Sequence, residues 1–142
     1  MMKDSATLYE YAAPNPHIFV AEYDAKIFLK LITNKHKHPF NFWAHKNGQS
    51  FNPKQNSQRY ELFSKNTKCA NCDINGTVVV LEKGPKDKTP HFNLYGLNDE
   101  GKRVLMTKDH IKPKSLGGLN APSNYQTMCI VCNELKGSDY GE

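Results

Sequence analysis

The chain has 142 residues, of which 38% are hydrophobic and 11% aromatic, and its formal net charge is +5. This length suits one domain with a modest core, or one small domain with an extension. No apolar run approaches the roughly 18 residues of a membrane span, and no apolar segment follows the N-terminal residues as in a secretory signal, so we expect a soluble cytoplasmic protein without membrane contact.

The N-terminal part of the chain predicts irregular structure followed by a helix. Residues 1–16 end in Pro14-Asn15-Pro16 and are expected to be irregular. Apolar side chains over residues 22–33 are spaced as in a partly buried helix, which the Lys and His run at 35–38 would end. Residues 39–57, rich in Asn, Gln, His and Lys, predict a loop anchored by aromatic side chains.

A second short helix is predicted from Ser57 to Lys65, with Ser57 as its N-cap. After this helix the composition changes, so we place a domain boundary near residue 65. Beyond it, short strands are predicted at Thr77–Glu82, His91–Tyr95 and Arg103–Thr107, followed by a loop, a short strand and a terminal helix. The predicted fold class is therefore α+β, with an N-terminal helical, basic extension (1–65) and a C-terminal domain (66–142).

Positive charge is concentrated between Ala25 and Lys68, where nine basic residues accompany one acid, Glu61. The basic residues are Lys26, Lys30, Lys35, Lys37, Lys46, Lys54, Arg59, Lys65 and Lys68. Such a stretch favours a polyanionic partner, because each neutralised phosphate releases counterions; a solvated surface is the plain alternative. We predict nucleic-acid contacts at Lys35, Lys37 and Lys46, and interpret the neighbouring histidines as part of a solvated loop.

The four cysteines form two pairs, Cys69/Cys72 and Cys129/Cys132, each with two residues between them. Thiolates at this spacing point the same way from a tight turn, and two such pairs complete a closed tetrahedron around Zn²⁺. In a reducing compartment, metal binding is expected rather than two disulfides, and a redox site would need a βαβ pattern that is absent here. We predict a structural zinc ion, with the 56 residues between the pairs folding back to bring them together.

The segment from Lys108 to Gly118 carries the most specific motif. Its letters Asp-His-Ile-x-Pro-x-Ser-x-Gly-Gly are followed by Asn124, fourteen residues after His110, and by Cys-x-x-Cys-Asn-x-x-Lys at 129–136. This order resembles the HNH endonucleases, which share the ββα-metal or His-Me finger fold, over roughly residues 66–137. Many members have a metal-binding His after the last Cys, whereas this chain has Asn133, a His-Asn-Asn version similar to the HNH domains of RNA-guided CRISPR nucleases.

The resemblance implies a role for each motif residue. His110 is expected to be the general base, because a neutral imidazole suits deprotonation of water near pH 7. Asp109 and Asn133 would hold a catalytic divalent ion, and their oxygen donors favour Mg²⁺ or Mn²⁺. Asn124 would fix the loop beside His110. Phosphate contacts are predicted for Lys112, Lys114 and Lys136, for which an ordinary surface position is the alternative.

The sequence therefore predicts a metal-dependent endonuclease that hydrolyses DNA and nicks one strand per active site, with RNA not excluded. A non-catalytic zinc-containing module that binds nucleic acid is the main alternative, and a protein-interaction zinc domain is a third. The motif formed by Asp109, His110 and Asn133 favours the enzyme, because a binding module has no need of it. Sequence preference, oligomeric state and a role in defence, phage DNA processing or homing are left open.

Overall fold

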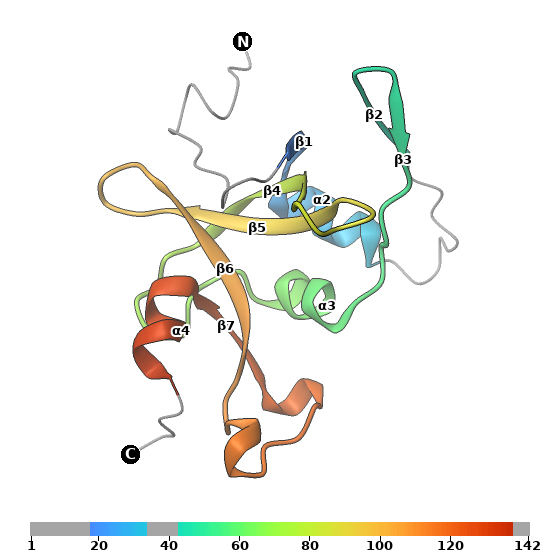
Figure 1. The fold of residues 1–142 in the computed structure, drawn as a ribbon. Helices are drawn as coiled ribbons and strands as arrows, with labels where there is room; N and C mark the ends of the chain where they lie inside the picture. Colours follow the sequence, from blue (N-terminus) through green and yellow to red (C-terminus); the bar gives the residue numbers. More distant parts are fainter. Residues whose placement is uncertain (1–17, 34–42, 138–142) are drawn as a thin grey trace.

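The computed structural model describes residues 18–33 and 43–137 of the chain. They form a five-stranded antiparallel sheet in the order β1-β4-β5-β6-β7, a separate two-stranded hairpin and three α-helices (Figure 1). The sheet strands are β1 (Ile18–Asp24), β4 (Gly76–Lys83), β5 (His91–Leu97), β6 (Arg103–His110) and β7 (Tyr125–Cys129). None of the described helices combines the length and apolar character needed to cross a bilayer.

The helix α2 (Ala25–Ile32) follows β1 without a loop, because Asp24 ends the strand and caps the helix. Its carboxylate accepts a hydrogen bond from the Ile27 backbone N–H at 3.1 Å. Phe28, Leu29 and Ile32 lie on the buried face of the helix. The helix predicted from residue 22 therefore begins three residues later, since pairing with β4 keeps residues 22–24 extended.

The helix α3 (Gln58–Lys65) confirms the prediction from the sequence. The Ser57 hydroxyl accepts a hydrogen bond from the Tyr60 N–H at 3.1 Å, as expected of an N-cap. Tyr60 and Phe63 are buried against the core, where the Tyr60 ring meets Phe92 of β5 edge-on.

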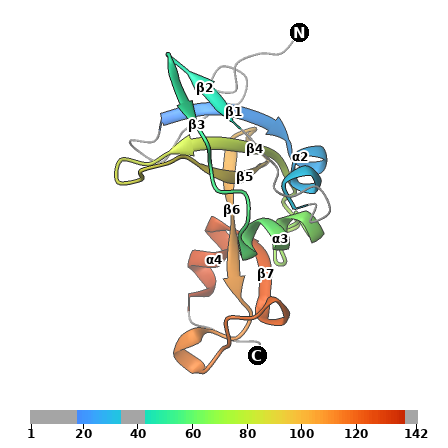
Figure 2. The same cartoon turned by 90° about the vertical axis from the view of Figure 1, so that its right-hand side faces the viewer.

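A short hairpin corrects the loop predicted over residues 39–57. Strands β2 (Ala44–Lys46) and β3 (Gln49–Phe51) pair antiparallel around Asn47 and Gly48, both with positive φ. Positive φ at both central residues is typical of a two-residue hairpin turn, for which Asn-Gly is the preferred sequence. The hairpin projects away from the C-terminal elements (Figure 2).

The strand β6 pairs with β5 over its first residues and with β7 over its last ones. Its first residues, Arg103–Leu105, pair with β5, whereas Met106–His110 pair with β7. Beyond β7 comes α4 (Ile130–Lys136), which lies beside β6 and β7 at the lower end of the molecule (Figure 2). The order strand, strand, helix follows the predicted sequence of elements, with two short 3-10 turns, η2 (Lys114–Leu116) and η3 (Pro122–Asn124), in the connecting loop.

One core spans the boundary that we predict near residue 65. Phe28 of α2 contacts Phe92 of β5 with ring centroids 5.0 Å apart, and Phe63 of α3 joins the same cluster as Met106 and Met128. The strand β1 pairs with β4 along its length. The described residues on both sides of residue 65 therefore share a sheet and a core instead of forming two independent ones.

Candidate active site and cysteine cluster

The four cysteines converge although 56 residues separate the two pairs in the sequence. All four sulfur atoms lie within 4.8 Å of one another, and the Cys72 and Cys129 sulfurs are 3.7 Å apart. Tetrahedral coordination with Zn–S bonds of 2.3 Å places sulfurs about 3.8 Å apart, so this spacing fits a zinc ion. Cys69, Cys129 and Cys132 are buried, whereas Cys72 is exposed.

Amide donors surround the sulfurs. The Asn71 backbone N–H and side-chain Nδ2 donate to Cys69 Sγ and Cys132 Sγ at 3.4 and 3.3 Å. Burial raises the pKa of the Cys69 thiol, but hydrogen bonds from nearby backbone N–H groups outweigh it and lower that pKa to about 7. For Cys129 burial dominates and raises the pKa to about 12. The cluster therefore combines one readily ionised thiol with N–H donors that suit thiolate ligands.

The cysteine cluster also determines where α4 begins. Cys129 ends β7 and caps α4, with its sulfur accepting from the Cys132 N–H at 3.4 Å. The loop that carries Cys69 is fastened to β7 by a hydrogen bond of 2.8 Å from the Ala70 N–H to the Thr127 carbonyl. A metal ion held by the cluster would thus fix α4, and with it Asn133 and Lys136, relative to β6 and β7.

Asp109 and His110 are the last two residues of β6, so their side chains leave the strand in opposite directions. The Asp109 side chain is 8% exposed and meets α4, where its Oδ2 lies 3.1 Å from Lys136 Nζ. Gln126 of β7 donates to the same oxygen at 2.9 Å. Lys136 Nζ also donates to the His110 carbonyl at 3.0 Å. Lys136 therefore joins the end of α4 to the end of β6.

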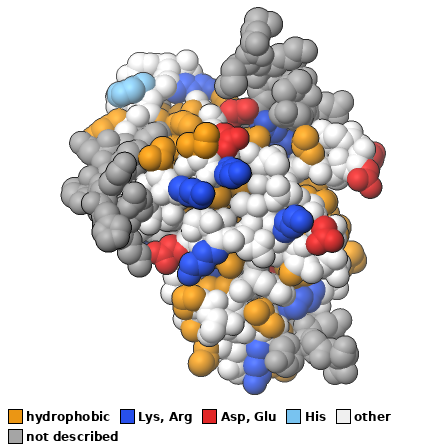
Figure 3. Space-filling view, turned by 180° about the vertical axis from the view of Figure 1, so that it is seen from behind, with side chains coloured by type: hydrophobic (Ala, Val, Ile, Leu, Met, Phe, Trp, Pro, Cys, Tyr) orange, Lys and Arg blue, Asp and Glu red, His pale blue; other side chains and the backbone are white. Residues whose placement is uncertain are grey.

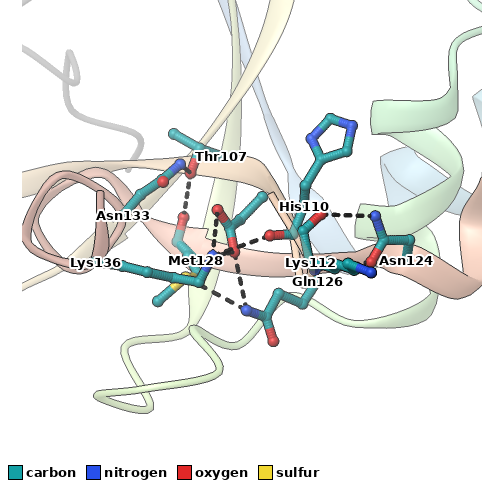
Figure 4. A network of polar contacts seen from close by, with 9 residues as sticks. Thr107, His110, Lys112, Asn124, Gln126, Met128, Asn133 and Lys136 are labelled. Carbon is teal, nitrogen blue, oxygen red and sulfur yellow. Dashed lines mark hydrogen bonds and ion pairs between the residues drawn. The ribbon is translucent and has the colours of Figure 1, made fainter. Parts of the chain in front are cut away.

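The His110 imidazole points away from α4, which carries Asn133 and Lys136 (Figure 4). Its Nε2 lies 2.8 Å from the Asn120 side-chain oxygen, and its ring meets the Tyr125 ring at 90° with centroids 5.1 Å apart. Because a carbonyl oxygen can only accept, a neutral His110 ring that makes this contact needs its proton on Nε2, which leaves Nδ1 free to accept one. The structure thus brings Asp109 together with Lys136, and His110 together with Asn120 and Tyr125.

Asn124 holds both ends of the loop from 111 to 124. Its side-chain oxygen accepts from the Lys112 N–H at 2.9 Å, and its Nδ2 donates to the carbonyls of Lys112 and Leu119 at 3.1 and 2.9 Å. Its own carbonyl accepts from the Ile111 N–H at 2.8 Å. This geometry matches the loop-fixing role that the resemblance implies.

The two glycines of the motif serve this loop in different ways. Gly117 has a φ of 91°, which side chains of L residues rarely adopt. Gly118 packs so closely that an added Cβ would lie 1.8 Å from the Lys112 carbonyl oxygen. Substitution of either glycine is therefore expected to disturb the loop beside His110.

Asn133 lies on α4 one turn before Lys136, and its Nδ2 donates to Thr107 Oγ1 of β6 at 2.9 Å (Figure 4). This bond uses the amide nitrogen, whereas a divalent ion would need the amide oxygen. A buried carboxylate is costly without a cation, and Lys136 already supplies one to Asp109. Asp109 and Asn133 lie on neighbouring elements and both carry side-chain oxygens, the donor type that Mg²⁺ or Mn²⁺ prefers.

The predicted nucleic-acid lysines have different surroundings. Lys112 and Lys114 are exposed on the loop beside His110. Lys46 is half-buried, and its Nζ donates to the Phe19 carbonyl and lies over the Phe19 ring. Lys35 and Lys37, together with His36 and His38, fall outside the described residues.

Several residues of this region were not predicted from the sequence: Thr107, Asn120, Gln126 and Tyr125. The alternation of β7 gives a partial signal for Gln126, because it lies opposite Asp109 in the antiparallel register. No sequence signal identifies Asn120, whose contact with His110 depends on the path of the loop.

Comparison with known protein families matches residues 98–141 to the family described as HNH endonuclease. This match covers β6, the loop, β7 and α4, which are the elements that carry the polar residues described above. No curated protein and no solved structure gives a significant match to the chain.

Proposed function

We propose that this chain, whose residues 98–141 match the family described as HNH endonuclease, is a metal-dependent endonuclease that hydrolyses phosphodiester bonds of DNA. The observation that carries the proposal is the junction of β6 with α4, where Lys136 Nζ contacts both Asp109 and the His110 carbonyl. It brings the Asp-His pair next to the helix that bears Asn133. Strands β6 and β7 and helix α4 would then be the ββα-metal unit.

His110 is proposed as the general base. Its imidazole accepts a proton from the attacking water at Nδ1, while Asn120 engages Nε2 and orients the ring. In-line displacement places the attacking water and the leaving oxygen on opposite sides of phosphorus. Base and cation must therefore flank the phosphate, and the opposite directions of the Asp109 and His110 side chains suit this arrangement.

Asp109 and Asn133 are proposed to hold the catalytic ion, Mg²⁺ or Mn²⁺, through their side-chain oxygens. When bound, this ion would act as a Lewis acid on the phosphate and the leaving oxygen. Lys136 would then be released from Asp109 to contact a phosphate, as we expect for Lys112 and Lys114. Because both proposed ligands offer oxygen rather than imidazole nitrogen, we infer a preference for hard ions over Ni²⁺ or Zn²⁺. The cysteine cluster is proposed to hold a separate, structural Zn²⁺.

The proposal is tested by incubating the purified protein with supercoiled DNA in a panel of divalent ions and resolving nicked from linear products. We expect nicking in Mg²⁺ or Mn²⁺, and loss of at least about 100-fold in rate for His110→Ala, the size of a general-base contribution. His91→Ala is the matched control, because His91 is half-exposed on β5 and far from the motif in sequence.

Undiminished nicking by His110→Ala would contradict the assignment of the base. Equal cleavage in Ni²⁺ or Zn²⁺ and in Mg²⁺ would contradict the inferred metal preference. DNA binding without cleavage in every metal would favour the alternative, a non-catalytic zinc-containing nucleic-acid-binding module, for which the cysteine cluster would suffice.

A further inference from the structure

A groove of about 440 Å³ lies between α2, α3 and the start of β4. It involves none of the motif residues of the candidate active site. Three lysines from the two helices line it: Lys26 and Lys30 of α2 and Lys65 of α3. All three are exposed residues.

The lining of this groove, called here the lysine groove, is suited to an anion. The acid that lines it is Asp24, whose carboxylate is engaged at the N-terminus of α2 by the Ile27 N–H. The remaining polar lining consists of hydroxyl and amide side chains, which bind phosphate oxygens through neutral hydrogen bonds. They are Ser64, Asn66, Thr67, Asn75 and Thr77.

The spacing of the lysines favours an extended ligand. Lys26 and Lys30 lie four positions apart in one helix, so they are on the same face and about 6 Å apart along its axis. Lys65 approaches the groove from a different helix. A ligand that reaches all three amines must run across the groove, which suits a chain of phosphates better than a single small anion.

A second, smaller cavity lies between α3 and the start of β7. Lys65 lines this cavity as well, and the rest of its lining is Gln58, Glu61, Leu62, Pro122 and Tyr125. The Tyr125 hydroxyl donates to Gln58 Oε1 at 2.7 Å, which joins α3 to β7. The Tyr125 ring also contacts the His110 ring, and Lys108 Nζ lies 4.2 Å from the Tyr125 ring centroid. Tyr125 therefore contacts both Gln58 of α3 and His110 of β6.

Figure 3 shows one face of the molecule, on which basic and acidic side chains both occur. Lys and Arg side chains occur on it at several levels, from the upper part of the molecule to its lower end, with Asp and Glu side chains among them. We propose that the lysine groove binds the phosphate backbone of DNA and directs the strand past Tyr125 to His110. This inference rests on the proposed nuclease function, and it adds the α2–α3 groove to the nucleic-acid contacts predicted at Lys35, Lys37 and Lys46.

The test measures DNA binding by fluorescence anisotropy in the His110→Ala background, so that a labelled duplex stays intact. In this background the triple variant Lys26→Ala, Lys30→Ala, Lys65→Ala is compared with a control triple, Lys86→Ala, Lys88→Ala, Lys102→Ala. The control removes the same charge from exposed lysines in the β4–β5 and β5–β6 turns. We expect affinity at 0.1 M salt to fall at least about tenfold for the groove variant and less than about twofold for the control.

The dependence on salt gives a second measurement. Each lost phosphate contact lowers the slope of log K against log salt by about one, so the groove variant should lose a slope of about 2–3. If the groove variant and the control triple variant lose equal DNA affinity, the proposal is wrong, because net charge alone would then explain the loss. Unchanged binding by the groove variant, or by the matching Gln triple if the Ala triple melts early, would overturn it too.

These outcomes are separate from failure of the proposed nuclease. If the wild-type protein cleaves DNA while both triples bind alike, the groove is refuted and the nuclease stands. If the wild-type protein binds but never cleaves, the nuclease is refuted, and the difference between the two triples still decides whether the groove contacts DNA.

Discussion

Asn124 makes three side-chain hydrogen bonds to backbone groups on both sides of the loop beside His110. A side chain that satisfies backbone groups of a non-repetitive loop replaces the hydrogen bonds that a helix or a sheet would provide. Without the Asn124 side chain, one backbone N–H and two backbone carbonyls lose their hydrogen-bond partner and must bind water instead. The position of His110 relative to Asn120 depends on that loop, because Asn120 lies within it.

We therefore predict that Asn124→Ala lowers the free energy of unfolding by about 1–3 kcal/mol, and lowers cleavage more than DNA binding. The measurements are denaturant unfolding, plasmid nicking and anisotropy. Asn98→Ala is the matched control, since the Asn98 side chain also accepts from backbone N–H groups, those of Glu100 and Lys102, but in the β5–β6 turn. A loss of cleavage by the control equal to that of Asn124→Ala would show that stability alone explains the effect.

At the scale of elements, the cysteine cluster and the candidate active site share α4. Cys129 and Cys132 belong to the start of this helix, and Asn133 directly follows Cys132. The helix has seven residues, a length at which isolated helices are unstable in water. Its position consequently depends on the sulfur cluster at one end and on the Lys136 contacts at the other.

This dependence predicts that Cys129→Ser abolishes stoichiometric zinc and lowers the melting temperature by about 10 °C or more. Zinc content by mass spectrometry and thermal melts with and without chelator provide the measurements. Chelation should reproduce the loss in the wild-type protein but change the melt of Cys129→Ser little. Metal content of one zinc per chain in the variant, with a wild-type melt, would exclude the cluster as a zinc site.

At the scale of the whole molecule, residues on both sides of position 65 build one core. The helices α2 and α3 contribute Phe28, Ile32 and Phe63 to it, and each of these side chains is buried. Strand β1 covers one edge of β4. Removing residues 1–65 would expose β4 as an edge strand and remove the aromatic partners of Phe92.

We predict that the fragment 66–142 does not fold cooperatively on its own, even with zinc. Circular dichroism melts and binding of a hydrophobic dye give the measurements, with the full chain as the control. Broad melting with dye binding is expected of a collapsed state that lacks specific packing. A sharp, reversible melt of the fragment would instead support two domains with a boundary near residue 65.

The sequence by itself determined the features that depend on local chemistry. The Ser57 cap acts within three residues, and the strands around Val79 and Leu94 follow from β-branched and apolar composition. The motif from Asp109 to Lys136 lies within the residues that match the HNH endonuclease family. The spacing of the four cysteines predicts that they lie close together, because a tetrahedral metal site needs all four thiolates. These features rest on interactions between near neighbours, or on ligand geometry that leaves few alternatives.

Only the tertiary structure decided which distant segments meet. The pairing of β1 with β4 joins Ile18 to Lys83, and no local pattern distinguishes that partner from other apolar strands. The contacts of Lys136 with Asp109, and of Asn120 with His110, likewise depend on how α4 and the loop pack against β6. The lysine groove exists because α2 and α3 come together over β4. Contacts between distant segments form only when the whole chain folds around one core. The sequence of a single segment therefore does not determine its partner.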